Sequence, residues 1–367
     1  MQINKIKLWQ LPLSSHETYY MADGKTCDTV DTIVIALETD EGITGWGEVC
    51  PIPHYLPAYA NGVAPAVKEM SALIIGADPL GPEALMHTLE QHLQGHRYAK
   101  SAIDTALWDI TAKAANLPLY RLLGGRLNKT LPLYHSITCI DPDAMAEMAV
   151  AAQQQGISQF QAKLGADNNW QQDVRRLIKV REAVGEGPLV YGDWNCGASQ
   201  LDATRVARAV AQHDIMLEQP CRTLEQCSAV KNATGLAMKI DESAHDTASL
   251  LQAHNLGCMD AVALKLSKFG GLSAMRRARD LCLHLGAKMC IEDTWGSDIT
   301  TATAIHLATA TPADNVMNVC DLSGYVSPRL DNTGPERKNG GITISDTPGH
   351  GITPNADLLA DAQLTLQ

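Results

Sequence analysis

Three strand-like runs each end on an acidic residue: Tyr191-Gly192-Asp193, Ile215-Met216-Leu217-Glu218 and Met238-Lys239-Ile240-Asp241. Their carboxylates are 25 and 23 residues apart. Because such a gap holds one strand, one helix and two loops, the spacing predicts consecutive βα units of a barrel. The carboxyl ends of parallel barrel strands share one rim, where barrel enzymes carry out their chemistry. We therefore expect the three acids to converge there.

Two lysines end similar runs on either side of these acids. Lys163 closes a run 30 residues before Asp193, and Lys265 closes another 24 residues after Asp241. Three carboxylates with no sulfur or imidazole beside them favour a hard cation. Mg²⁺ is the first choice because it prefers oxygen ligands and keeps positions open for water or a substrate carboxylate. The pattern therefore predicts a magnesium site flanked by two bases.

This arrangement permits the abstraction of a proton next to a carboxylate. A lysine with its ordinary pKa of about 10.4 is a poor base at neutral pH. Near a divalent cation in a closed pocket, its ammonium form is disfavoured and its pKa falls. The metal would also hold the substrate carboxylate and stabilise the enediolate that forms when the α-proton leaves.

Length and composition limit what kind of protein carries this site. The 367 residues are enough for a barrel of about 200–250 residues and roughly 100 more in a second domain. The formal charge of −12 argues against a nucleic-acid surface, which needs a concentrated basic patch. No apolar stretch approaches the roughly 18 residues of a membrane span.

The cysteines and the first residues indicate the compartment. None of the ten cysteines forms a C-x-x-C pair, and neither they nor the twelve histidines show the spacing of zinc ligands. Met1–Lys5 leads into an alternating strand pattern without the apolar core of a signal peptide. We expect reduced, buried thiols in a cytoplasmic protein.

Residues 1–125 do not share the barrel period, which covers residues 126–324. Strands are predicted in the first part at Ile3–Leu11, Thr32–Thr39 and Ile43–Val49, and helices at about 62–75, 80–95 and 97–116. This order is typical of an α+β domain. The eight strand ends of the barrel lie near Ser136, Lys163, Asp193, Glu218, Asp241, Lys265, Glu292 and Val319. Residues 325–367, with one short predicted strand at Ile342–Ile344, are expected to pack back on the first domain.

Five motifs occur in the order found in the enolase superfamily, in its muconate-lactonizing-enzyme-like subgroup, which the chain resembles from end to end. They are Ser101-Ala102-Ile103-Asp104-Thr105-Ala106-Leu107-Trp108-Asp109, Leu122-Leu123-Gly124-Gly125, Glu218-Gln219-Pro220, Asp241-Glu242 and Gly270-Gly271-Leu272. The resemblance implies an α/β fold, in which a (β/α)7β TIM-like barrel carries an α+β capping domain built from the N-terminal segment plus the C-terminal tail. It also implies Mg²⁺ on Asp193, Glu218 and Asp241, catalytic lysines at Lys163 and Lys265, and a homo-oligomer.

One position departs from the family pattern. The family carries Lys-x-Lys on the second strand, whereas this chain has Gln161-Ala162-Lys163. The missing lysine removes a like charge that would help to lower the pKa of Lys163. Gln161 is interpreted either as a hydrogen-bond partner of the substrate carboxylate or as a plain polar core residue. Asn195 and Glu242, near the first and third metal ligands, are expected to support them.

Substrate contacts should come from capping-domain loops and from strand ends that carry no metal ligand. The candidates are Tyr19 or Tyr20, His54, Tyr55, Gln161, Asn195, Glu292, Asp293 and Trp295. An indole ring beside two acids suits a ring-bearing ammonium substrate. We therefore expect a small-molecule amino-acid substrate.

The stretches Glu218–Cys221 and Asp293–Ile299 most resemble the branch of the family that acts on proline derivatives. Members that epimerise proline betaines use a further tryptophan after the eighth strand, where this chain has Cys320-Asp321. Without that ring the cation–π contact is lost, and the added acid suits an N–H donor. An unmethylated amino acid is therefore favoured over a betaine.

The resemblance also suggests a reaction. In the subgroup the sixth-strand lysine faces the α-proton of the L isomer, and the second-strand lysine faces the opposite side. In cis-3-hydroxy-L-proline the hydroxyl lies opposite the α-proton. Lys265 would remove that proton while Lys163 protonates the departing hydroxyl, which gives Δ1-pyrroline-2-carboxylate. The expected enzyme is a cis-3-hydroxy-L-proline dehydratase, a hydro-lyase.

Three alternatives stand beside this expectation. With no leaving group, Lys163 would return a proton, as in a racemase or 2-epimerase of proline, its betaine or an N-acyl amino acid. Acid-sugar dehydration is less favoured because those relatives place a histidine on the seventh strand, where this chain has Glu292. A non-catalytic scaffold would have no reason to keep both lysines and all three acids.

Overall fold

The computed structural model describes residues 1–359 and 361–367. Its centre is a sheet of eight parallel strands in which each strand pairs with its neighbours along the chain. A parallel bridge between Leu133 and Val319 joins the two ends of the sheet and closes it into a barrel. The barrel strands are β5 (His135–Ile137), β6 (Gln159–Lys163), β7 (Leu189–Asp193), β8 (Ile215–Glu218), β9 (Met238–Ile240), β10 (Ala261–Lys265), β11 (Lys288–Glu292) and β12 (Val316–Val319).

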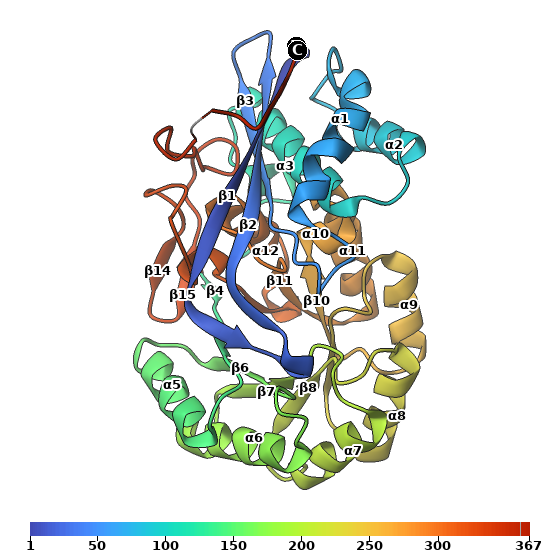
Figure 1. Ribbon diagram of the computed structural model, residues 1–367, viewed down its shortest axis with the longest axis vertical. Coiled ribbons are helices and arrows are strands. Elements are labelled where there is room, and N and C mark those ends of the chain that lie inside the picture. The colour runs from blue at the N-terminus through green and yellow to red at the C-terminus, as the bar shows by residue number, and fades with distance from the viewer. Residues whose placement is uncertain (360) are drawn as a thin grey trace.

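Helices alternate with these strands, as the period of the sequence predicts. Figure 1 shows α5 to α9 along the outside of the barrel. Seven strand–helix units and a last strand give the expected (β/α)7β barrel, in which a single short turn, α10, precedes α11. The helices are α5 (Pro142–Gln154), α6 (Trp170–Val184), α7 (Gln200–Ala209), α8 (Leu224–Thr234), α9 (Thr247–Asn255), α10 (Leu266–Phe269), α11 (Leu272–Leu285) and α12 (Asp298–Thr309).

The N-terminal residues form the expected α+β unit, but its first two strands are much longer than predicted. β1 (Ile3–Tyr20) and β2 (Thr26–Thr39) form an antiparallel hairpin that reaches down to the barrel (Figure 1). The sequence pattern of β1 ends early because Pro12 and the polar residues after it interrupt the apolar alternation. That segment is nevertheless paired, with Pro12 opposite Asp31. The extension carries Tyr19 to the cavity at the barrel mouth.

The third strand of this sheet, β3 (Thr44–Val49), lies directly against a helix. A Cβ on Gly47 would lie 1.8 Å from the carbonyl oxygen of Ala102 in α3. Only glycine therefore permits the strand to approach the helix so closely. The helices of this domain are α1 (Val63–Ile74), α2 (Pro82–His92), α3 (Arg97–Ala114) and α4 (Leu119–Leu122).

Two aspartates of α3 tie the capping domain to the rest of the molecule. Asp104 accepts hydrogen bonds from Ser273 N at 2.7 Å and from Ser273 Oγ at 2.6 Å, in the first turn of α11. Asp109 accepts a hydrogen bond from His350 N, in the C-terminal tail, at 3.0 Å. The motif Ser101–Asp109 therefore joins three parts of the chain.

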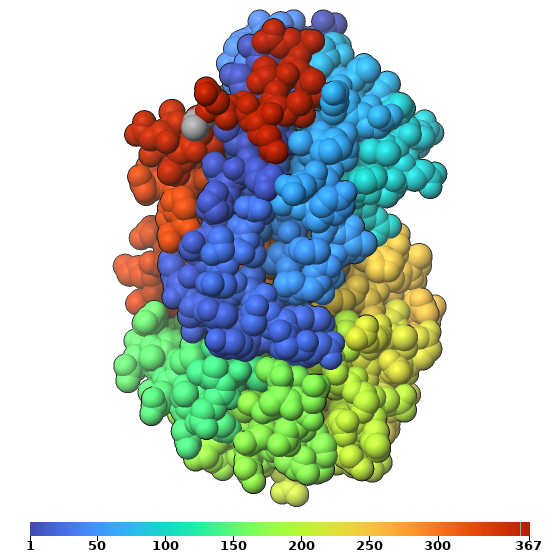
Figure 2. Space-filling model, in the orientation of Figure 1, coloured from blue at the N-terminus to red at the C-terminus, as the bar shows by residue number. Residues whose placement is uncertain are grey.

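The C-terminal tail returns to the first strand. β13 (Val326–Ser327) and β16 (Leu364–Leu366) both pair with β1, and Figure 2 shows the end of the chain lying against the N-terminal segment. The short strand predicted in the tail is β15 (Gly341–Thr343), which pairs with β14 (Glu336–Lys338) and β4 (Leu131–Pro132). The tail thus contacts both the capping sheet and the entry to the barrel.

The cysteines agree with the expectation of free thiols. All ten are unpaired, and all but Cys196 are buried. Within residues 1–359 and 361–367, no helix combines the length and the apolar character that a membrane crossing requires.

Candidate active site

Three acids lie at the mouth of the barrel on successive strands. Asp193 ends β7, Glu218 ends β8 directly opposite it in register, and Asp241 follows β9. All three side chains are buried. They meet because residues at the carboxyl ends of neighbouring parallel strands lie on the same rim.

The two lysines predicted as bases pair with different acids. Lys163 Nζ lies 2.5 Å from Asp193 Oδ2, and Lys265 Nζ lies 2.6 Å from Asp241 Oδ2. Lys163 belongs to the second strand of the ring and Lys265 to the sixth, so half of the barrel separates them. Both side chains line one cavity of about 40 Å³.

A further lysine at this site was not found from the sequence. Lys268 Nζ donates hydrogen bonds to Asp241 Oδ1 at 2.8 Å and to the carbonyl oxygen of Ala263 at 3.0 Å. Its position three residues after Lys265, one helical turn away, was the available signal. The helix that carries it, α10, is too short to show a recognisable period.

Glu292 is held in place on the Lys265 side of the cavity. Its Oε1 lies 4.0 Å from Lys265 Nζ, and its Oε2 accepts a hydrogen bond from the Tyr134 hydroxyl at 2.5 Å. Tyr134, which the sequence did not single out, also lines the cavity. One carboxylate oxygen of Glu292 is therefore fixed by the protein, and the other faces the predicted base.

Asp293 lines the same cavity, but its carboxylate accepts hydrogen bonds from backbone N–H groups. Both of its oxygens accept hydrogen bonds from Ser267 N at 3.1 Å, and Oδ1 accepts one from Thr294 N at 2.7 Å. Burial raises the pKa of the Asp293 carboxyl to about 6. These bonds hold the start of α10, which follows β10 directly, and a contact of Asp293 with substrate stays a prediction.

Trp295 belongs to an aromatic wall of the cavity. Its ring meets Tyr19 edge-on at 5.5 Å and lies 6.3 Å from Tyr325, measured between ring centroids. The Nε1 of Trp295 is buried without a hydrogen-bond partner. The loop that carries this ring is held by the capping domain, because Glu48 Oε1 accepts a hydrogen bond from Ser297 N at 2.8 Å.

Tyr55 closes the cavity from the side of the capping domain. Its ring centroid lies 5.5 Å from Lys265 Nζ, and its hydroxyl donates to Met21 Sδ at 2.9 Å. The other two candidates from this domain lie elsewhere. Tyr20 is exposed, and His54 lines a separate depression.

Residues 13–124 match the mandelate racemase / muconate lactonizing enzyme N-terminal domain, and residues 144–358 match the enolase C-terminal domain-like family. The chain belongs to the enolase superfamily. The resemblance drawn from the five motifs is thereby confirmed.

Two curated relatives cover nearly the whole chain. It is 38% identical to a cis-3-hydroxy-L-proline dehydratase of Roseibium aggregatum. The match extends over 363 residues and covers 98% of each chain. The chain is 28% identical over 366 residues to an N-succinyl-L-Arg/Lys racemase of Bacillus cereus, again over 98% of each chain. An enolase-superfamily member from Roseovarius nubinhibens, solved in complex with magnesium, superimposes with a TM-score of 0.94 at 30% identity. The match covers 100% of this chain and 99% of that one.

In this enolase-superfamily site the three acids suit a magnesium ion. The donors are carboxylates, and Glu218 Oε1 is buried without a hydrogen bond. Burial, together with the nearby Asp193 and Asp241, raises the pKa of the Glu218 carboxyl to about 7, although the charge of Lys239 acts in the opposite direction. A divalent cation relieves such repulsion. Asp193, Glu218 and Asp241 therefore fit Mg²⁺ chemically.

Two of the three acids are paired with lysines in this structure. Among the described residues, no three acidic, histidine or cysteine side chains stand close enough to hold a metal as they are. The ammonium groups of Lys163 and Lys265 occupy Oδ2 of Asp193 and Oδ2 of Asp241. Asp193, Glu218 and Asp241 would hold the cation, whose charge would replace that of the two ammonium groups.

The same contacts set the charge of the two lysines. Burial lowers the pKa of Lys163, but Asp193, together with Tyr55 and Glu218, outweighs burial and holds the pKa above its usual range. Burial also lowers the pKa of Lys265, and there Asp241, together with Glu292 and Glu242, outweighs burial. The sequence predicted lowered pKa values, on the assumption of a cation among the acids. Either lysine becomes a base only when such a cation offsets the pull of its carboxylate.

Gln161 bridges two strands beneath the acids. Its Nε2 donates to Glu218 Oε2 at 2.7 Å, and its Oε1 accepts a hydrogen bond from Ser136 Oγ at 2.9 Å. Both ends of the amide are therefore used by the protein. Gln161 thus supports Glu218, and because it also lines the lysine cavity, its contact with a substrate carboxylate stays a prediction.

Asn195 has a similar supporting position beside the first acid. Its Nδ2 donates to Asp193 Oδ2 at 3.0 Å and to Glu242 Oε1 at 3.1 Å. Asn195 is not among the described residues that line the lysine cavity. In this structure it supports Asp193, and its contact with a substrate stays a prediction.

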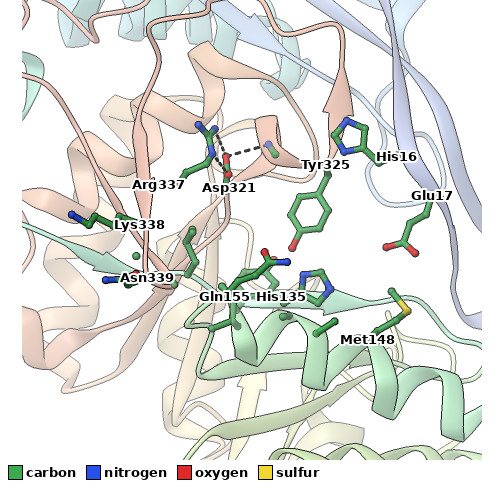
Figure 3. Close-up of a pocket in the computed structure, with 18 of the residues that line it drawn as sticks. His16, Glu17, His135, Met148, Gln155, Asp321, Tyr325, Arg337, Lys338 and Asn339 are labelled. Atoms are coloured by element: carbon green, nitrogen blue, oxygen red, sulfur yellow. Dashed lines mark hydrogen bonds and ion pairs between the residues drawn. The ribbon is translucent and has the colours of Figure 1, made fainter.

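A wider cavity of about 760 Å³ adjoins the lysine cavity, and three tyrosines line both: Tyr19, Tyr134 and Tyr325. Figure 3 shows Tyr325 and His135 in its wall, beside the ion pair of Arg337 with Asp321. Arg337 Nη2 donates to Asp321 Oδ1 at 2.6 Å. The expectation that Asp321 faces a substrate N–H is therefore wrong, because Arg337 neutralises this acid and the lysine cavity is lined by Cys320 instead.

Proposed function

We propose that the chain is a Mg²⁺-dependent dehydratase that converts cis-3-hydroxy-L-proline to Δ1-pyrroline-2-carboxylate. The proposal rests on the pair of amines that line one cavity from opposite strands of the barrel. The cis isomer carries its hydroxyl on the face opposite the α-proton, so its elimination needs two groups on opposite sides. The similarity to the Roseibium aggregatum dehydratase supports the same reaction.

Lys265 acts as the base in the proposed reaction. It removes the proton from Cα, and the electron pair of that bond forms a Cα–Cβ double bond as the Cβ–O bond breaks. Lys163 donates a proton to the hydroxyl, which leaves as water. The enamine then loses its N–H proton and gains one at Cβ, which gives the cyclic imine. When bound, Mg²⁺ would supply positive charge to the substrate carboxylate while the α-proton leaves.

Glu292 is the group placed to accept a hydrogen bond from the substrate amine. Tyr134 holds its Oε2, and its Oε1 faces the cavity near Lys265. An unmethylated amine donates an N–H to this oxygen, whereas a betaine has none. Cys320 stands where a betaine-binding ring would be needed. These features support an unmethylated imino acid.

Substrate entry requires the cavity to open. Its volume of about 40 Å³ is far below the roughly 300 Å³ at which small-molecule pockets begin. The loops that carry Met21 and Tyr55 meet above it through their 2.9 Å hydrogen bond. In the proposed cycle these two loops part to admit the substrate.

The proposal is tested by proton NMR in D₂O with purified protein, Mg²⁺ and cis-3-hydroxy-L-proline. We expect loss of the α-proton signal and growth of the pyrroline carboxylate, both abolished by EDTA and restored by Mg²⁺. The trans isomer serves as the matched control, because its hydroxyl lies on the wrong face for Lys163. Product from the trans isomer alone, or from neither isomer, would overturn the assignment.

A racemase or 2-epimerase of proline, its betaine or an N-acyl amino acid is the second candidate. The 28% identity to the Bacillus cereus racemase over 98% of both chains favours it, and the same two lysines serve it. The NMR experiment separates the two reactions. Deuterium at Cα of recovered substrate, without any pyrroline, would identify the second candidate.

A further inference from the structure

Lys239 is a fully buried lysine beneath the site, and the proposed reaction does not use it. It lies on β9 two residues before Asp241, and its Nζ lies 2.9 Å from Glu218 Oε1. We propose that Lys239 is a positioning residue that supplies, from below, the positive charge that fixes Glu218 for the metal ion. The inference rests on the magnesium site of the proposed function.

The barrel interior is layered at this point. Because side chains alternate along a strand, residues two positions apart both face the interior, one layer above the other. The upper layer includes Lys163, Asp193 and Asp241. The lower layer, two residues earlier on the same strands, includes Gln161, Tyr191 and Lys239. Gln161 and Lys239 therefore each face the interior one layer below Lys163 and Asp241 on their own strands.

Both of these positions reach the same carboxylate. Gln161 Nε2 donates to Glu218 Oε2 at 2.7 Å, while Lys239 Nζ stands at 2.9 Å from Oε1. In register, Lys239 is the direct cross-strand neighbour of Glu218. Gln161 is neutral, so of this pair only Lys239 brings a charge to a carboxylate that has no access to water.

The surroundings of Lys239 argue against a role in packing alone. Its Nζ lies over the ring faces of Tyr191 and Tyr134, 4.8 Å and 5.5 Å from their centroids. The Glu218 contact is close but not aligned as a hydrogen bond, and Nζ has no hydrogen-bond partner. An ammonium stripped of water in this way is costly compared with an apolar residue of the same size. Its charge therefore has a use, and Glu218 is the carboxylate it contacts.

The first test is the affinity for Mg²⁺ alone, measured by calorimetry without substrate. Lys239→Met should weaken Mg²⁺ binding by about tenfold or more, as loss of a group that orients a metal ligand does. Lys100→Met is the matched control. Lys100 is equally buried and pairs with Glu90 Oε2 at 2.8 Å, but it lies in the capping domain. It should leave the Mg²⁺ affinity unchanged.

The second test moves the positive charge from position 239 to position 161, on the other side of Glu218. Gln161→Lys in the Lys239→Met background returns a cation to the other oxygen of Glu218, and should restore most of the lost affinity. A merely structural lysine would not be rescued in this way. Wild-type affinity in Lys239→Met, or a double variant no better than the single one, would overturn the proposal.

Two further measurements keep the outcome decisive. Circular dichroism and thermal unfolding without metal show whether each variant is folded. Lys239→Gln keeps a donor beside Glu218 but removes the charge, so it should also lose affinity; if it binds like wild type, the charge has no role. If Lys239→Met does not fold, the Mg²⁺ affinity of Lys239→Gln relative to wild type tests the proposal instead. If the protein binds Mg²⁺ but leaves cis-3-hydroxy-L-proline intact, the substrate assignment fails. The inference about Lys239 is then still decided by the Mg²⁺ affinities of its variants.

Discussion

Lys163 and Lys265 are identical side chains with different partners, so their roles can be separated. Lys265→Met should abolish both exchange of the substrate α-proton and dehydration, because it removes the base. Lys163→Met should keep α-proton exchange while dehydration falls by about 100-fold or more, because it removes the proton donor to the hydroxyl. Both rates are read from one NMR time course in D₂O with cis-3-hydroxy-L-proline.

The control for both variants is Mg²⁺ binding, which each should retain because the cation would replace these two ammonium groups at Asp193 and Asp241. The reverse pattern, exchange lost in Lys163→Met and kept in Lys265→Met, would show that the two roles are exchanged. Loss of exchange in both would indicate that the second lysine is also needed for the first step.

The hydroxyl of Tyr134 gives a prediction about substrate binding. Tyr134→Phe keeps the ring but removes the 2.5 Å hydrogen bond to Glu292. A hydrogen bond to a charged group contributes about 1.5–3 kcal/mol, so KM for the imino acid should rise by about tenfold or more while kcat changes little. Steady-state kinetics measure both. An unchanged KM would mean that Glu292 does not face the substrate amine.

At the scale of elements, Glu48 connects β3 to the helix after Trp295. Its carboxylate accepts hydrogen bonds from Ser297 N at 2.8 Å and from Thr300 N at 2.9 Å, at the start of α12. Glu48→Ala leaves these buried donors unpaired and should lower the free energy of unfolding by about 2–4 kcal/mol. Urea denaturation measures the loss.

A second glutamate of the same sheet provides the control. Glu38, on β2, forms a partly exposed ion pair with Lys7 at 2.6 Å. Glu38→Ala should change the free energy of unfolding by less than about 1 kcal/mol, because exposed ion pairs are screened by water. Equal effects of the two substitutions would show that Glu48 does not secure the start of α12.

The elements differ in how well the sequence predicts them, and the reason is the range of the interactions. The α3 prediction of 97–116 is close to Arg97–Ala114 because helix signals are local. β1 continues nine residues past its predicted end at Leu11, since the later part is specified by pairing with β2. Strand pairing depends on a partner distant in sequence, which no local pattern records.

At the scale of the molecule, the even spacing of charged strand ends was enough to predict the barrel. The spacing does not show how the barrel closes, because Leu133 and Val319 are far apart in the sequence. The same limit applies to the site. The positions of Lys163 and Lys265 at strand ends can be recognised in the sequence. The proposed role of Lys239 depends on its cross-strand neighbour Glu218, which no local pattern indicates.

His306 lies where three parts of the molecule meet and predicts how stability depends on pH. It is buried on α12, and its Nδ1 accepts a hydrogen bond from the backbone N–H of Tyr120, on α4, at 3.1 Å. The Tyr120 hydroxyl in turn donates to Asp346 in the tail at 2.5 Å. Burial, reinforced by the nearby His350, lowers the pKa of His306 to about 3. Its ordinary pKa is about 6.5.

The folded chain therefore keeps His306 neutral at a pH where the unfolded chain protonates it. This contribution to stability is fully present above about pH 6.5 and is lost as the pH falls toward 3. At pH 5 the loss from this one group is about 2 kcal/mol relative to pH 7.

The variant His306→Gln keeps an acceptor for Tyr120 but has no group that titrates in this range. Between pH 7 and pH 5, urea denaturation should therefore show a loss of stability that is smaller than that of wild type by about 2 kcal/mol. His284→Gln, at an exposed position near the end of α11, is the control and should follow wild type. Identical pH slopes for wild type and His306→Gln would mean that protonation of His306 does not oppose the packing of these three parts.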